Sequence, residues 1–146
     1  MRLIVAIGFL CRMLGFHGHA ESQARKAIRG DKSNHQAWRL LGIELADRAC
    51  GCPPDTALEE EAKNAFMTAY ALAPSDFVVV WNACTYLAFL GKFSEALLIA
   101  EGYGRIDKAG GAKLLANIHL TEKVGSTRGF KKCDEPYSCD ETEPPG

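Results

Sequence analysis

Apolar and small residues recur every three or four positions along most of the first 124 residues, which is the spacing of one face of an α-helix. The pattern is broken where a helix cannot continue, at Gly91 and in the stretch "ACGCPPDTA", where Gly51, Pro53 and Pro54 stand together. The pattern therefore predicts an all-α domain made of consecutive amphipathic helices.

The helical pattern also repeats along the chain. The segment "HQAWRLLGIEL" (35–45) aligns with "MRLIVAIGFLC" (1–11) at an offset of 34, which places Trp38 on Ile4, Leu41 on Ile7, and Gly42 on Gly8. The following segments align at an offset of 42, so eight extra residues lie before Ala62 and extend a turn between two helices. We expect the aligned positions to form a core.

The alignment predicts three helix pairs and one further helix. The third unit follows the second at an offset of 34 and begins with "FVVVWNACTYLAFLGKF". One helix pair cannot bury its apolar face alone, so a terminal helix is expected to cover the last pair. The predicted units are 1–34, 35–76 with an insertion near 50–57, and 77–110, followed by a capping helix at 111–124.

The repeat resembles the tetratricopeptide repeat family, whose unit of 34 residues carries W-x2-L-G-x2-Y, then A-x3-F, then P. "WRLLG" (38–42) matches the first part and "AKNAFMTAYALAP" (62–74) matches the second. The eight-residue insertion, Val80 in place of Trp, and lysines at 32 and 108 in place of Pro depart from the family pattern. The resemblance implies a right-handed α-solenoid of three antiparallel helix pairs with a C-terminal capping helix.

The resemblance also implies a binding groove, because the first helix of each pair lines the concave surface in this family. A second stripe on these helices, outside the core positions, is largely apolar, and such patches commonly mark partner sites. We expect Trp81 with Arg39 to be the main binding contacts. The alternatives are that Trp81 and Phe89 belong to the core, and that Arg12 and Arg39 are solvated or form ion pairs within the molecule. The expected groove residues are Val5, Phe9, Arg12, Met13, Gln36, Arg39, Leu40, Ile43, Asp47, Val78, Trp81, Asn82, Thr85 and Phe89.

A groove of this kind predicts a non-enzymatic interaction module that binds an apolar peptide or a partner helix, as an adaptor or scaffold. Two alternatives stay open. The size, repeat number and apolar groove are similar to small type III secretion chaperones, which hold an export client. The chain also starts directly in a repeat helix, which suggests self-association into a larger array.

Charge and chemical motifs narrow the function further. The 146 residues carry a net charge of −1, which argues against a nucleic-acid partner. No catalytic triad order, phosphate-binding glycine loop or HExxH motif is present, so no enzyme, metal or cofactor is expected. Four thiols on zinc, or disulfides within two close pairs, are minority alternatives for Cys50, Cys52, Cys133 and Cys139.

The two ends of the chain bear on the location of the protein and on the extent of its helical domain. The first twenty residues resemble a secretory signal, but Arg12 interrupts the apolar run, and the run is too short to span a bilayer. We therefore expect a cytoplasmic protein without a membrane partner, with a secreted or periplasmic location as the minority alternative. Residues 125–146 are acidic and rich in proline, and we expect a flexible tail.

Overall fold

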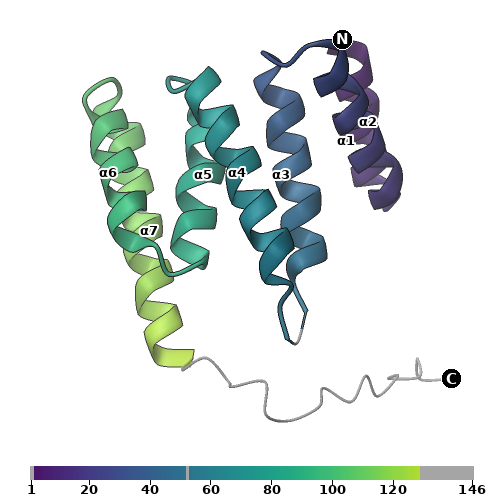
Figure 1. Cartoon of the computed structure of the whole chain (residues 1–146). Coiled ribbons are helices and arrows are strands. Elements are labelled where there is room, and N and C mark those ends of the chain that lie inside the picture. Colours follow the sequence, from purple (N-terminus) through teal and green to yellow (C-terminus); the bar gives the residue numbers. More distant parts are fainter. Residues whose placement is uncertain (1, 52, 129–146) are drawn as a thin grey trace, which may run out of the picture.

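The computed structural model describes residues 2–51 and 53–128, with side chains through 124. This part of the chain is helical, has no strand, and confirms the all-α expectation (Figure 1). The helices are α1 (Arg2–Met13), α2 (His17–Gly30), α3 (His35–Ala49), α4 (Thr56–Leu72), α5 (Phe77–Phe89), α6 (Phe93–Gly104) and α7 (Lys108–Arg128).

Local sequence signals set the starts and turns of these helices. Asn34, Asp55 and Asp76 are the N-cap residues of α3, α4 and α5, and their side chains accept hydrogen bonds from the first free backbone N–H groups. Gly15 and Gly91 occupy equivalent positions in the repeat alignment, and both have positive φ angles, 83° and 77°. Because glycine has no Cβ, it adopts this conformation without strain and lets the chain reverse between paired helices.

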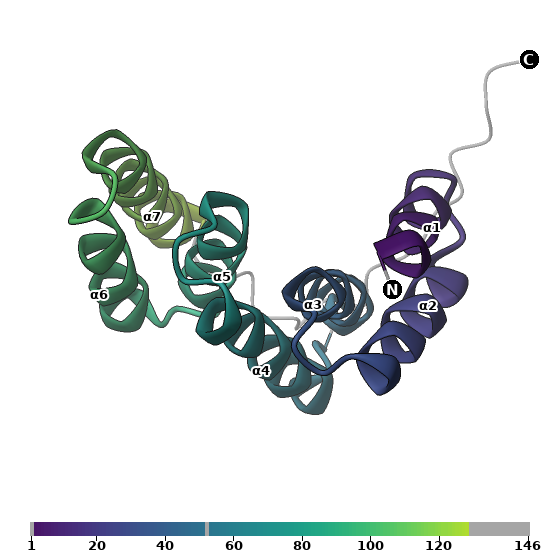
Figure 2. The ribbon, with the colours of Figure 1, turned by 90° about the horizontal axis from the view of Figure 1, so that it is seen from above.

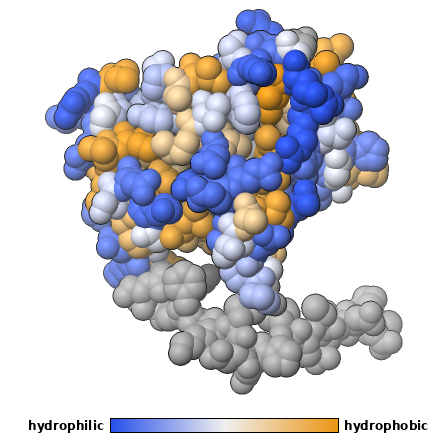
Figure 3. Space-filling model, in the orientation of Figure 1, coloured by the Kyte–Doolittle hydropathy of each residue, from blue (hydrophilic) through white to orange (hydrophobic). Residues whose placement is uncertain are grey.

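Each helix packs against the next helix along the chain, and α1, α3 and α5 each also contact the helix two places further on. Seen from above, the helices form an arc, with α1, α3, α5 and α7 on its inner side and α2, α4 and α6 on its outer side (Figure 2). In the view of Figure 3, hydrophilic residues gather over α4 in the middle, whereas hydrophobic residues show on the left over α6. The outer face is therefore not uniformly polar.

Two large apolar clusters form most of the core. One joins α3 and α4 to their neighbours through Leu40, Leu45 and Phe66, and the other joins α5 and α6 to α7 through residues such as Leu87 and Leu114. Gly42 permits the close approach of α3 and α4, because a Cβ at this position would lie 2.8 Å from the Phe66 ring. The aligned position Gly42 therefore contributes to the core as the repeat predicted.

The first helix departs from the predicted core positions. Ile7, expected in the core, is 42% exposed, whereas Val5, expected in the groove, is only 5% exposed. Helix α1 packs through Val5 and Gly8, with Ile4 partly buried beside them and Ile7 largely outside the contact, so its buried face is shifted from the predicted one. Trp38 is half-buried and its ring N–H donates to the carbonyl of Lys32, so it also lies at the margin of the core.

The bounds of the last helix differ from the predicted segments. Residues 50–55 join α3 to α4, which is where the insertion was expected. Helix α7 begins at Lys108, before the predicted 111, and continues through Arg128, so residues 125–128 belong to a helix and not to a tail. The remainder of the predicted tail, 129–146, lies outside the described residues. None of the described helices combines the length and the apolar character needed to cross a bilayer.

Candidate functional site

Two clefts open on the inner helices, and Trp81 of α5 lines both of them. The larger lies between α5 and α7 and has a volume of about 570 Å³. The smaller, of about 330 Å³, lies between α5 and the C-terminal part of α3. Because Trp81 is half-buried, part of its indole packs against the core while the rest forms a wall of each cleft. The two alternatives for Trp81, groove or core, therefore both hold in part.

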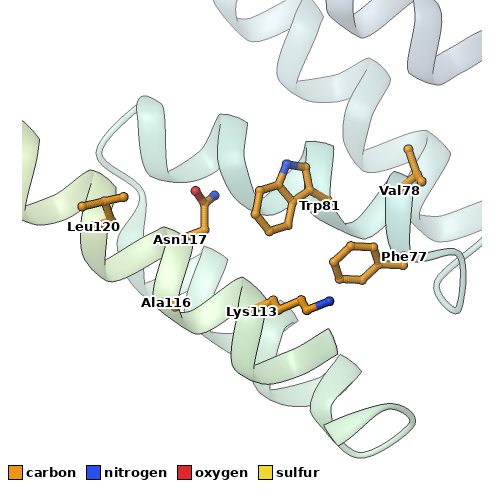
Figure 4. A pocket seen from close by; sticks show the side chains of 7 residues that line it. All are labelled: Phe77, Val78, Trp81, Lys113, Ala116, Asn117 and Leu120. Carbon is orange, nitrogen blue, oxygen red and sulfur yellow. The ribbon is translucent and has the colours of Figure 1, made fainter. Parts of the chain in front are cut away.

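The α5–α7 cleft is mainly apolar. Phe77 and Trp81 of α5 face side chains of α7 across it (Figure 4). Asn117 donates a 2.9 Å hydrogen bond to the Thr85 hydroxyl, which fixes the two helices at this point. One charged side chain, that of Lys113, is among the lining residues, which are Phe77, Val78, Trp81, Lys113, Ala116, Asn117 and Leu120.

The contribution of α7 was missed by the sequence analysis, which assigned this helix only a capping role. Its residues 113, 116, 117 and 120 have the spacing of one helical face, and Leu120 is 60% exposed. Leu114 and Ile118 on the neighbouring face are fully buried. This face of α7 alternates polar residues, Lys113 and Asn117, with Ala116 and Leu120, so no apolar stripe marked it in the sequence.

The α3–α5 cleft has an aromatic lining. Tyr86 packs at a ring-centroid distance of 5.1 Å from Phe66 and is stacked at 6.0 Å on Phe89, which is 54% exposed. This cleft brings together five of the predicted groove residues: Asp47, Trp81, Asn82, Thr85 and Phe89. Its other lining residues are Ala46, Cys50, Phe66 and Tyr86.

Two polar atoms beside this cleft have no hydrogen-bond partner among the described residues: the Asn82 Oδ1 atom and the Tyr86 hydroxyl. Burial, followed by the nearby Glu59 and Cys50, raises the pKa of Tyr86 to about 12, so the hydroxyl keeps its proton at neutral pH. Both atoms are hidden from solvent. A buried polar atom without a partner typically costs about 1–3 kcal/mol.

Arg12 and Asp47, both expected in the groove, bind each other. The Arg12 guanidinium lies 2.6 Å from the Asp47 carboxylate and 2.9 Å from that of Glu44, which is 1% exposed. Burial alone would lower the pKa of Arg12, but the hydrogen bonds to these two carboxylates outweigh it and raise the pKa. The pairing joins α1 to α3 and reduces what either side chain offers to a partner.

The same cluster also resembles a metal site in its composition. Ligand atoms of His17, Glu44 and Asp47 lie within 4.8 Å of one another. However, Arg12 binds both carboxylates, and His17 Nδ1 lies 3.0 Å from Glu44. The residues present therefore fit a closed ion-pair cluster better than a cation site, because the arginine already supplies the positive charge.

Three more predicted groove residues, Phe9, Gln36 and Arg39, form a second contact between α1 and α3. The Arg39 guanidinium carbon lies 4.6 Å from the centre of the Phe9 ring, and its Nε donates to Gln36. Gln36 in turn donates to Asp76, the N-cap of α5, over 3.3 Å. Burial lowers the pKa of Arg39. Arg39 therefore supports the helix packing beside the clefts and lines neither of them.

The remaining predicted groove residues differ in how deeply they are buried. Leu40 is fully buried, as Val5 nearly is, so assigning these two residues to the groove was wrong: both side chains pack into the core. Ile43 is half-buried against the same core. Val78 and Met13 are 48% and 84% exposed, but Met13 lies on α1 and lines neither cleft.

Comparison with known proteins identifies no family for this chain. No protein-family model matches the chain, and no curated protein sequence matches it significantly.

Proposed function

We propose that the protein is a non-enzymatic interaction module with a right-handed solenoid of the tetratricopeptide type. It binds an apolar peptide or partner helix on its inner helices. We place it in the cytoplasm, where thiols stay reduced. Cys11, Cys50 and Cys84 form no disulfide with one another within the described part of the chain, which is compatible with this compartment.

The position of Trp81 carries this proposal. A half-buried tryptophan between two open, mainly apolar clefts offers a large rigid surface at little conformational cost to the protein. Tryptophan is also a residue type enriched among the strongest contacts of protein interfaces. Phe77 supports the indole from one side, with ring centroids 5.8 Å apart, so the anchor is held in place before a ligand arrives.

The lining of the larger cleft defines the chemistry of the ligand. Its walls are the row of Phe77 and Trp81 on α5 and the row ending in Leu120 on α7, so a ligand with apolar side chains on one face fits between them. Lys113 is the charged residue of this lining, and it favours a ligand carboxylate near that end. We propose an amphipathic segment with apolar anchors and at least one acidic residue.

The test is selection of binding peptides from a random library, followed by calorimetric titration of the selected peptide. We expect Trp81→Ser and Leu120→Ser each to raise its Kd at least about tenfold, because each removes an apolar wall of the cleft. Leu98→Ser is the matched control, since Leu98 is 72% exposed on the outer helix α6. Peptides that bind the parent and all three variants equally, or that require no apolar residue, would contradict the proposed site.

Fluorescence gives an independent readout of the same binding event. In a Trp38→Phe background, Trp81 is the remaining tryptophan of the chain. Binding in either cleft should shift its emission to shorter wavelength as water leaves the indole. Binding without a change in emission would place the ligand elsewhere on the molecule.

A further inference from the structure

The 18 residues that follow α7 in the sequence have the chemistry of the ligand proposed for the α5–α7 cleft. This acidic segment, 129–146, carries five acidic residues against two lysines, together with two large aromatic residues, Phe130 and Tyr137. The proposed ligand combines apolar anchors with at least one acidic residue. The chain therefore contains a candidate ligand for its own cleft.

Charge favours contact between the acidic segment and α7. Helix α7 carries four basic residues and one acidic residue, a net charge of +3, whereas residues 129–146 have a net charge of −3. Lys113 lies on α7 across the cleft from Trp81 (Figure 4), and it has no ion-pair partner among the described residues. Lys63 and Lys92, by contrast, each pair with a glutamate. The unpaired cation of the cleft thus lies on the helix that the acidic segment follows.

The acidic segment is long enough to return to the cleft. Because an α-helix rises about 1.5 Å per residue, Leu120 and Lys113 lie about 12 Å and about 22 Å before the end of α7 at Arg128. An extended chain covers about 3.3 Å per residue, so Tyr137 reaches up to about 30 Å and Asp140 up to about 40 Å from Arg128. Both spans exceed the distance to the cleft and leave enough chain for a change of direction after α7.

The spacing within the acidic segment also matches the spacing of the cleft. Tyr137 and Asp140 are three residues apart, which corresponds to about 10 Å in an extended chain. Leu120 and Lys113 are seven residues apart on α7, which also corresponds to about 10 Å along the helix axis. An aromatic anchor beside Leu120 therefore brings a carboxylate to Lys113. Pro136, directly before Tyr137, favours the extended backbone that this register needs.

We propose that residues 129–146 turn back along α7 and occupy the α5–α7 cleft of their own chain, so that an external ligand has to displace them. This inference rests on the peptide site proposed above and adds regulation to it. Tyr137 is the apolar anchor beside Trp81, and Asp140 pairs with Lys113. The acidic segment runs antiparallel to α7 in this arrangement.

Attachment to α7 makes a weak contact sufficient for this role. A segment joined to its site by a short linker has an effective concentration in the mM range, so an intrinsic Kd of about 0.1 mM keeps it bound about nine-tenths of the time. An external ligand then binds only the open fraction of the molecules, and its apparent Kd rises about tenfold. The acidic segment therefore selects for ligands that fit the cleft better than it does.

The first experiment measures the emission of Trp81 in the Trp38→Phe background. Tyr137→Ser should shift this emission to longer wavelength, because water replaces the ring beside the indole. Phe130→Ser is the matched control, since Phe130 lies two residues after Arg128 and reaches only about 7 Å from it, short of the cleft. Circular dichroism checks that both variants keep the parental helix content. Unchanged emission in Tyr137→Ser, or an equal shift in Phe130→Ser, would overturn the proposed contact.

Carbodiimide coupling of the chain tests the position of the acidic segment directly, because this reagent joins a carboxylate to an ammonium group in contact with it. We expect peptide mapping to find Lys113 joined to a carboxylate of residues 134–143 within one chain, at every protein concentration. The Lys63–Glu60 pair, 2.8 Å apart, is the internal standard. Equal coupling of the segment to Lys113 and to the exposed Lys123, or coupling only between two chains, would overturn the proposal.

Titration with the peptide selected for the proposed site separates this inference from the site itself. Tyr137→Ser should lower the Kd of that peptide about tenfold, because the cleft is then open. An unchanged Kd, with binding that still depends on Trp81 and Leu120, would overturn the contact with the acidic segment and leave the peptide site in place. Coupling at Lys113 and a shifted Trp81 emission, without any peptide that binds even to Tyr137→Ser, would support the contact and contradict the proposed function.

Discussion

Gly111 of α7 packs directly against Gly104 of α6. A Cβ atom at Gly111 would lie 2.4 Å from the Gly104 Cα atom and 3.0 Å from its nitrogen. The neighbouring atoms belong to the backbone, so no flexible side chain can move aside to make room. This contact sets the distance of α7 from α6, and with it the position of one wall of the α5–α7 cleft.

Replacing Gly111 with alanine should therefore destabilise the protein, although alanine favours a helix. We expect the free energy of unfolding to fall by about 1–3 kcal/mol, as for other overpacked sites. Gly102→Ala is the control, because no atom lies within 4 Å of its added Cβ, and the better helix propensity should raise stability by about 0.5–1 kcal/mol. Urea unfolding followed by circular dichroism measures the free energy of unfolding of both variants. Equal changes in the two variants would contradict the proposed contact between the α6 and α7 backbones.

Removal of the Arg12 charge should be costly. In Arg12→Met the Glu44 carboxylate stays buried close to the Asp47 carboxylate, with His17 as its hydrogen-bond partner, and we expect a loss of about 3–5 kcal/mol. The double variant Arg12→Met with Glu44→Gln should recover part of this loss, because the buried charge is then absent. Denaturant unfolding of the parent and both variants provides the test. A loss below about 1 kcal/mol in Arg12→Met would show that water replaces the guanidinium.

Acid should weaken the ion pair that joins Glu21 of α2 to Arg48 of α3. Burial alone would raise the pKa of Glu21, but hydrogen bonds from Arg48, at 2.6 Å, and Arg25, at 3.0 Å, lower it overall. A lowered pKa in the folded state means that this stabilisation is fully present above the ordinary value of 4.5 and is lost as the pH falls through the folded-state value. The stability of Glu21→Gln should therefore fall less steeply below pH 4.5 than the stability of the parent protein. Thermal unfolding of both proteins at a series of pH values measures this difference. Glu101→Gln, at an exposed carboxylate on α6, is the matched control variant.

Tyr86→Phe should not lower stability. The hydroxyl is buried without a partner among the described residues, so its removal leaves the ring contacts with Phe66 and Phe89 intact. We expect the free energy of unfolding to stay equal or to rise by up to about 1 kcal/mol. A fall of more than about 1 kcal/mol would show that the hydroxyl is hydrogen-bonded in the protein, through a water molecule for instance.

The periodic pattern was enough to predict an all-α chain, and it placed a break at Gly91, since both signals are local in sequence. It could not fix the rotation of α1. Nearly every residue from Leu3 to Cys11 is apolar or small, so a burial pattern based on Val5 reads almost as well as one based on Ile7. The choice depends on which residues α2 and α3 present, and the sequence of α1 does not contain this information.

The candidate site was predictable only in part for a related reason. Trp81 was identified because a tryptophan stands out in any stripe. The roles of Arg12 and Arg39 depend on side chains more than 25 residues away, Glu44 for Arg12 and Phe9 for Arg39, and no spacing rule links such pairs. The wall formed by Lys113 and Leu120 was missed because polar residues interrupt this face of α7, and the buried stripe with Leu114 and Ile118 accounted for the helix.

The packing of each helix only with helices one or two places away along the described chain has a kinetic consequence. Contacts that join nearby segments close short loops, and proteins dominated by such contacts fold fast for their size. The interior helices have neighbours on both sides, whereas α1 packs only against α2 and α3 within the described part of the chain. Loss of α1 would therefore leave the packing from α4 to α7 in place, and backbone amide protons should exchange first in α1 and last in the middle of the arc.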